Sequence, residues 1–241
     1  SPMQIIKLNA IDSTNRYLAD LVSEISLEDF AAVMAKEQTN GQGQRGSKWQ
    51  SEKGKNLIIS ILKKNIKTSV GCQFDINRRV SLAVYNTLKA FEIPKLSVKW
   101  PNDILSCSKK ISGILIQLMI KNQRIQHGII GVGINVNQIH FKNLPKATSM
   151  TTMKQEFFDL DALANELIKH LKFYFEISDK SVLNAEYEAV LFGMNKASTF
   201  LNNSGQTFKG IIRGVSNSGK LKVQSENTID EYDLKTIELI F

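Results

Sequence analysis

Residues 111–136 read ISGILIQLMIKNQRIQHGIIGVGINV, two long apolar runs separated by a short polar stretch. The runs 111–120 and 125–136 are rich in isoleucine and valine, and KNQR between them has the character of a turn. Such runs predict two antiparallel strands joined as a hairpin. The shorter run ILS (104–106), followed by the polar turn CSKK, predicts a third strand beside them. We therefore expect the chain to be built around an antiparallel sheet.

Periodicity on either side of this hairpin predicts further strands and helices. Strands are expected at 3–10, 31–37, 56–64 and 96–100. Helices are expected after Ser13, which suits an N-cap, from Ile76 to Phe91, over 160–171, and on to about Leu191. Because strands and helices do not alternate regularly, the pattern indicates an α+β fold. It consists of a mixed, largely antiparallel sheet flanked by helices, not a Rossmann layout.

The composition changes after Phe192 and Gly193. The roughly 50 residues that follow carry no helical stripe, and they consist of short apolar segments separated by Asn, Ser and Gly turns. This punctuation predicts a small β-barrel behind a larger α/β domain. We expect a first domain at 1–192 and a second at 193–241.

Composition narrows the classes of protein. The chain is 42% hydrophobic and 22% charged, as globular proteins are. No apolar run approaches the roughly 18 residues of a membrane helix, and no signal sequence is evident, so we expect a cytoplasmic protein without a membrane partner. Cys72 and Cys107 are too few and too far apart for a disulfide scaffold or a zinc site. The net charge of +8 favours anionic partners or simply keeps the chain in solution.

Two segments near the N-terminus carry side chains suited to ligand binding. DSTN (12–15) lies where a strand gives way to a helix. It is either an ordinary N-cap or a helix start whose N–H groups and hydroxyls bind an acceptor-rich group. KEQTNGQGQRGSKW (36–49) places three glycines near Trp49, which suits a loop that wraps a ligand as well as a surface loop. Its GxGxxG pattern is not a dinucleotide fingerprint, because a strand rather than a helix follows.

Three more segments lie around the predicted hairpin. KWPND (99–103) ends a strand at Pro101 and presents polar side chains at a sheet end, although a plain turn would use the same residues. KKISGIL (109–115) places lysine just before a buried strand, where the ammonium is held over a site or is simply solvated. GVGINVN (131–137) adds glycines that allow close backbone approach and asparagines able to read a purine or ribose edge.

Together and in this order, STN, the glycine loop ending in Trp49, KWPND, KxxGIL and GxGxNxN resemble the biotin protein ligases. The resemblance covers the whole chain and implies a class II synthetase-like catalytic domain with an SH3-like C-terminal domain, matched by GIIRGVSNSGKL (210–221). It implies that biotin and ATP form biotinyl-5′-AMP, after which biotin passes to a lysine of a biotin carboxyl carrier protein, as of acetyl-CoA carboxylase. Lipoate or octanoate ligases and transferases of the same fold, and more remotely a basic nucleic-acid-binding protein, are the alternatives.

The resemblance also implies roles for individual residues. The residues that it implies for biotin are Ser13, Thr14, Asn15, Gln38, Gly41, Gly43, Gln44, Arg45, Gly46, Trp49, Lys110 and Gly113. Those that it implies for ATP are Arg45, Gly46, Trp49, Asn102, Lys110 and Asn135. The expected catalytic set is Lys110, Arg45 and Asp103, in which Lys110 clamps the carboxylate and the α-phosphate.

Some of these roles stay open. Asp103 is expected either to orient or deprotonate the incoming lysine or to serve the metal. Mg²⁺ accompanies ATP near Asn135 or Asp103, with no direct protein ligand assigned. The family's loop reads GRGRRG, but Gln42 and Gln44 replace two of its arginines here, so we expect Arg45 to carry the phosphate contact. The resemblance further implies that the loop orders over its ligand and that Trp49 excludes water from it.

The expected partners follow from the same resemblance. Only a short stretch precedes Ser13, so the winged-helix DNA-binding domain of repressor relatives is not expected, and neither is a DNA partner. Ligases of this kind can dimerise through the sheet edge that also receives the carrier. Homodimer formation, the identity of the target carboxylase, the effect of the two glutamines and the role of the C-terminal domain are therefore left open.

Overall fold

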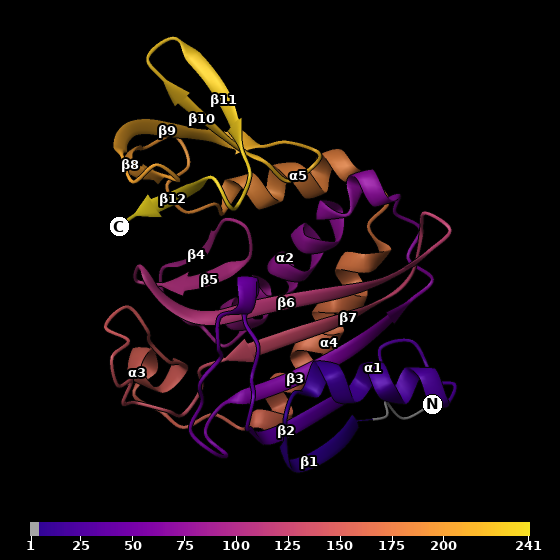
Figure 1. The fold of residues 1–241 in the computed structure, drawn as a ribbon. Helices are drawn as coiled ribbons and strands as arrows, with labels where there is room; N and C mark the ends of the chain where they lie inside the picture. The colour runs from indigo at the N-terminus through magenta and orange to yellow at the C-terminus, as the bar shows by residue number, and fades with distance from the viewer. Residues whose placement is uncertain (1–4) are drawn as a thin grey trace.

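Residues 5–241, which the computed structural model describes, form two sheets flanked by helices (Figure 1). The larger sheet has seven strands in the order β1-β2-β3-β7-β6-β5-β4. Only β1 and β2 run parallel, so the predicted mixed, largely antiparallel sheet is confirmed. Its strands are β1 (Ile5–Ile11), β2 (Ala32–Gln38), β3 (Leu57–Lys64), β4 (Leu96–Lys99), β5 (Asp103–Ser106), β6 (Lys109–Lys121) and β7 (Arg124–Ile134).

The predicted hairpin of β6 and β7 is confirmed, and it lies at the middle of this sheet. Its turn residues Asn122 and Gln123 both have positive φ, at 51° and 59°, which matches the twist of the strands that a two-residue hairpin loop must join. β5 pairs with the outer side of β6, and β3 pairs with β7. The predicted strand 104–106 is thus confirmed.

Helices cover the two faces of the large sheet differently. On one face, α1 (Thr14–Glu24) buries Leu18 against Val33, Leu62 and Ile129. Ser13 caps this helix as predicted, because its side chain accepts a hydrogen bond from the backbone N–H three residues on. This helix covers only part of the sheet face. The uncovered part of the face forms the wall of a cavity.

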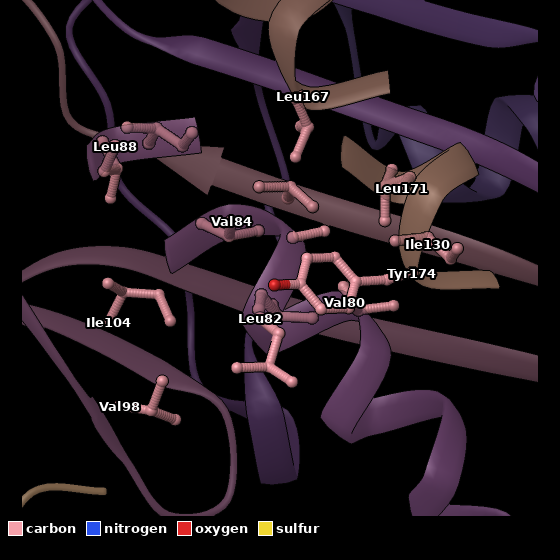
Figure 2. Close-up of a cluster of buried hydrophobic side chains, with 14 of the residues drawn as sticks. Val80, Leu82, Val84, Leu88, Val98, Ile104, Ile130, Leu167, Leu171 and Tyr174 are labelled. Carbon is pink, nitrogen blue, oxygen red and sulfur yellow. The ribbon is translucent and has the colours of Figure 1, made fainter. Parts of the chain in front are cut away.

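The opposite face packs against α2 (Phe74–Ala90) and α4 (Leu160–Glu176). Figure 2 shows this core, in which apolar side chains of the two helices meet those of the strands. The helix predicted from Ile76 begins two residues earlier. The short α3 (Met150–Lys154) was not predicted, because five residues carry too little periodicity to be noticed. α5 (Lys180–Ala189) completes the helices and leads to the second sheet.

The second sheet is built from strands of the last part of the chain. Its order is β11-β10-β9-β8-β12, and all pairs are antiparallel. Its strands are β8 (Ala197–Asn202), β9 (Thr207–Val215), β10 (Leu221–Ser225), β11 (Thr228–Tyr232) and β12 (Ile237–Ile240). This sheet lies beyond α5 and β4 in Figure 1. Across residues 5–241, every helix is too short or too polar to cross a membrane.

Candidate active site

A cavity of about 330 Å³ lies on the α1 face of the large sheet. It is enclosed by the start of α1, the glycine loop, the turn 99–103 and the strands β6 and β7, with further lining from the second sheet. Side chains alternate between the two faces of a strand. On β7, Ile130 and Val132 therefore enter the helical core while Gly131 and Gly133 face the cavity side.

One end of the cavity is a network of neutral polar groups. The backbone N–H and the hydroxyl of Thr14 both donate to Gln38 Oε1, at 2.9 and 3.2 Å. The Ser60 hydroxyl lies 2.7 Å from Thr14 Oγ1 and 2.5 Å from Asn15 Oδ1. The Asn15 amide donates to the Leu115 carbonyl at 3.2 Å. These buried hydrogen bonds hold each side chain in one orientation.

Trp49 forms the wall on the side of the glycine loop. Its indole ring lies on Gly113 and Gly133, which are directly paired across β6 and β7. A Cβ at Gly133 would be 2.6 Å from the indole Cε2, and one at Gly113 would be 2.9 Å from Cζ3. Only glycine leaves room for the ring at these two positions. Among residues 5–241, nothing accepts a hydrogen bond from the buried indole N–H.

The glycine loop folds back on itself above the cavity. The backbone N–H of Trp49 donates to the Gly41 carbonyl at 2.9 Å, and the Gln44 side chain donates to the Ile114 carbonyl at 3.4 Å. Arg45 is exposed at the tip with φ of 57°, and it lines the cavity. Within residues 5–241 no carboxylate lies within 4 Å of its guanidinium. The charge of Arg45 is therefore available to an anionic ligand.

The other end of the cavity is cationic. Lys110 Nζ lies 3.1 Å from Asp103 Oδ1 and 5.7 Å from the centroid of the Trp49 ring. Lys99 lines the same region, where burial lowers the pKa of its ammonium, an effect that Asp103 opposes and Lys110 reinforces. The Asn102 amide is used structurally, because it donates to the backbone carbonyl of β6 residue Ile114 at 3.0 Å.

A second cavity of about 620 Å³ lies beside the first and shares its wall at Lys48, Trp49 and Lys110. Its outer side is the segment 141–147, and Asn135 also lines it. The Asn135 amide donates to the Thr148 carbonyl at 3.0 Å, which leaves its side-chain oxygen free of any hydrogen bond with residues 5–241.

The Asn137 side chain is hydrogen-bonded within the protein and lines neither cavity. Its amide donates to the Phe158 carbonyl at 2.9 Å, and its oxygen accepts from the Phe158 N–H and the Thr151 hydroxyl, both at 3.0 Å. The sequence did not reveal this because the segment that Asn137 braces, around α3, was not predicted.

Most of the predicted site residues come together. Those that line the first cavity are Ser13, Thr14, Asn15, Gln38, Gly43, Gln44, Arg45, Trp49, Asn102, Asp103, Lys110 and Gly113. Gly41 and Gly46 line neither cavity: a Cβ on Gly41 would meet Trp49 and Gln38, whereas Gly46 has open space and φ of 77°. Sequence reasoning missed Ser60, whose only signal is one hydroxyl within the apolar strand IISIL. It also missed the segment 141–147 and the lining from the second sheet.

The lining of the two cavities suits small molecules that have a neutral polar part and a carboxylate or phosphate. Comparison with known proteins then identifies the family. The model of the biotin/lipoate A/B protein ligase family matches residues 8–135, and the chain belongs to this family.

Individual relatives are similar over most of the chain. The bifunctional ligase/repressor BirA of Escherichia coli is 29% identical over 230 residues, covering 92% of this chain and 70% of that protein. The biotin–[acetyl-CoA-carboxylase] ligase of Mycobacterium tuberculosis is 25% identical over 223 residues, covering 89% and 82%. The biotin protein ligase of Aquifex aeolicus, solved with biotin and ATP, has a TM-score of 0.80 at 25% identity and covers 98% of both chains.

Proposed function

We infer that this protein is an ATP-dependent biotin protein ligase of the biotin–[acetyl-CoA-carboxylase] type. It forms biotinyl-5′-AMP and then transfers biotin to a lysine of a carrier protein. The observation that carries the inference is the place of Lys110 on the wall that the two cavities share. An ammonium there can face the carboxylate of one ligand and the α-phosphate of the other at once.

We propose that the first cavity binds biotin with its ureido ring at the polar end. That ring has N–H donors and a carbonyl acceptor at fixed positions, and Ser13, Thr14 and Gln38 offer complementary groups. The apolar chain of biotin then runs along Trp49, and its carboxylate reaches Lys110. Supporting this placement, the polar end of the cavity is neutral and the opposite end is cationic.

We propose that ATP occupies the second cavity with its base under the segment 141–147. Its phosphates point toward Lys110 on the shared wall and toward Arg45 of the first cavity. Mg²⁺ usually reaches such sites with the phosphates and needs only one or two protein carboxylates. Within residues 5–241, no three acidic, histidine or cysteine side chains gather into a metal site. The half-buried carboxylate of Asp103 and the free oxygen of Asn135 fit this demand. When bound, the ion would help to neutralise the phosphates.

The reaction then proceeds in two steps, each a nucleophilic attack that expels a leaving group. In the first, a carboxylate oxygen of biotin attacks the α-phosphorus of ATP, and pyrophosphate leaves. In the second, the neutral amine of the carrier lysine attacks the carbonyl of the mixed anhydride, and AMP leaves. Lys110 stabilises the negative charge of the first transition state, and Asp103 accepts the proton from, or orients, the attacking amine. Trp49 and the glycine loop keep water from the anhydride.

Pyrophosphate exchange tests this function directly. The purified protein should exchange labelled pyrophosphate into ATP with biotin and Mg²⁺, because adenylate formation is reversible, and should not do so with lipoate. Adding a biotin carboxyl carrier domain should then give a product that streptavidin detects. Exchange with lipoate alone would instead identify a lipoate ligase, and exchange with neither acid would reject the proposed function.

A second test concerns the glycine loop, in which Arg45 is expected to contact phosphate and Gln44 is not. Arg45→Ala is expected to slow biotinyl-adenylate formation about 10- to 150-fold, because a hydrogen bond to a charged group contributes roughly 1.5–3 kcal/mol. Gln44→Ala should cost about 2- to 10-fold, since the glutamine brings no charge and its bond to Ile114 is long at 3.4 Å. Single-turnover measurements of both variants provide the comparison. Equal, minor losses would show that Arg45 does not carry the phosphate contact.

A further inference from the structure

The KWPND turn is hydrogen-bonded to the C-terminal sheet. The indole N–H of Trp100 donates to the carbonyl of Gly219 at 2.9 Å. Gly219 lies in the turn between β9 and β10, has φ of 91°, and would clash with Phe74 of α2 if it carried a Cβ, at 2.5 Å. The turn between β9 and β10 therefore lies tightly between the KWPND turn and α2.

A second bond reaches the next residue of the same turn. The hydroxyl of Tyr187 in α5 donates to the carbonyl of Pro101 at 2.7 Å. Tyr187 is fully buried, and its ring packs edge-on against Phe74 at 5.9 Å between centroids. Burial raises the pKa of this phenol, so the hydroxyl keeps its proton and remains a donor across the working pH range.

The turn between β9 and β10 is itself fixed to the large domain. Arg78 of α2 is 2% exposed and donates to the carbonyls of Val215 and Ser216 at 3.3 and 2.8 Å. The Val215 N–H donates to the carboxylate of Glu188 in α5 at 3.1 Å. The acceptor that meets Trp100 thus belongs to a rigid segment and not to a mobile loop tip.

The strand that leads into the KWPND turn is held as well. The Val98 N–H donates to the Val190 carbonyl at 2.8 Å, and the Phe192 N–H donates to the Val98 carbonyl at 2.7 Å. Asp103 follows Pro101 by two residues and reaches Lys110. The position of the carboxylate beside this ammonium therefore depends on bonds made by α5 and the C-terminal sheet.

We propose that Trp100 and Tyr187 are positioning residues that anchor the KWPND turn to α5 and the C-terminal sheet and so hold Asp103 beside Lys110. The proposal rests on the ligase function inferred above. It gives the C-terminal sheet a role in the reaction: its turn at Gly219 is part of the support of the catalytic pair.

The test uses Trp100→Phe and Tyr187→Phe, each of which removes one hydrogen-bond donor and little volume. Tyr174→Phe is the matched control, because Tyr174 is also a buried tyrosine and its hydroxyl is hydrogen-bonded to Glu186 and Asn86, which line neither cavity. Loss of one neutral bond corresponds to roughly 2- to 10-fold. We therefore expect the amides of residues 98–106 to exchange with deuterium about 2- to 10-fold faster in both variants, and kcat of adenylate formation to fall by a similar factor. The dissociation constant for biotin should stay within about twofold, since α1 and β2 hold the polar end of the cavity.

Hydrogen exchange and kcat allow the anchor and the ligase function to be tested separately. Faster exchange over 98–106 together with a lower kcat, neither seen in Tyr174→Phe, would support the proposal. Unchanged exchange, unchanged kcat, or a loss matched by the control would overturn it. The exchange measurement does not involve biotin, so it reports on the anchor even if the wild-type protein failed to form an adenylate. That failure would reject the ligase function instead, and with it any catalytic consequence of the anchor.

Discussion

Lys110→Met is expected to lower the rate of biotinyl-adenylate formation about 10²- to 10³-fold. A preorganised charge that faces developing negative charge is commonly worth this much, and methionine keeps most of the length of the side chain without the ammonium. The dissociation constant for biotin should rise less, because the neutral polar end of the cavity is untouched. Single-turnover formation of the adenylate with saturating biotin and ATP measures the effect.

Lys109→Met is the matched control, because Lys109 is the exposed neighbour on the same strand and loses the same charge. Its rate should stay within a factor of two of wild type. If Lys110→Met also stayed within that range, or if both variants lost activity equally, the ammonium at the wall between the cavities would not be the catalytic cation.

Gly133→Ala is expected to weaken biotin binding roughly 5- to 150-fold. The new Cβ would come within 3 Å of three atoms of the Trp49 ring, so the ring must leave the floor formed by the paired glycines. Overpacking of this kind typically costs about 1–3 kcal/mol, which gives the stated range of affinity. Isothermal titration with biotin measures the loss, and thermal unfolding shows how much stability accompanies it.

Gly128→Ala controls for the loss of a glycine from the same strand. A Cβ there comes closest to the ends of two flexible side chains, Ile66 and Leu118, at 3.2 Å, so the affinity for biotin should hardly change. Normal biotin affinity in Gly133→Ala would mean that the ring can leave its place without consequence, and Trp49 would then not be a wall of the biotin site.

The sequence predicted the parts of the fold that depend on local pattern. The β6–β7 hairpin followed from two β-branched runs around a polar turn, and α1 followed from an apolar stripe behind Ser13. The change to a second sheet followed from the loss of helical periodicity after Phe192. Each of these features depends on residues that are close together in the sequence. The sequence of this one chain was therefore enough to predict it.

The features of the site that the sequence did not predict depend on contacts between segments far apart in the chain. Ser60 became part of the site only because the pleat of β3 turns it toward α1, and an isolated serine gives no sign of that. The fit of Trp49 requires Gly113 and Gly133 to face each other, which depends on strand register. The contact of Trp100 with Gly219 joins residues 119 positions apart.

The hydrogen bonds around Ser60 restrict where the hydroxyl hydrogens of this cluster can point. Gln38 Oε1 and Asn15 Oδ1 can only accept, so Thr14 gives its hydroxyl hydrogen to Gln38, and the single hydroxyl hydrogen of Ser60 is shared between Thr14 Oγ1 and Asn15 Oδ1. The lone pairs of Thr14 and the amide hydrogens of Gln38 are then left for whatever enters. The site thus offers an acceptor and a donor in set places, and a ring with matching polarity would meet them without rearrangement of these side chains.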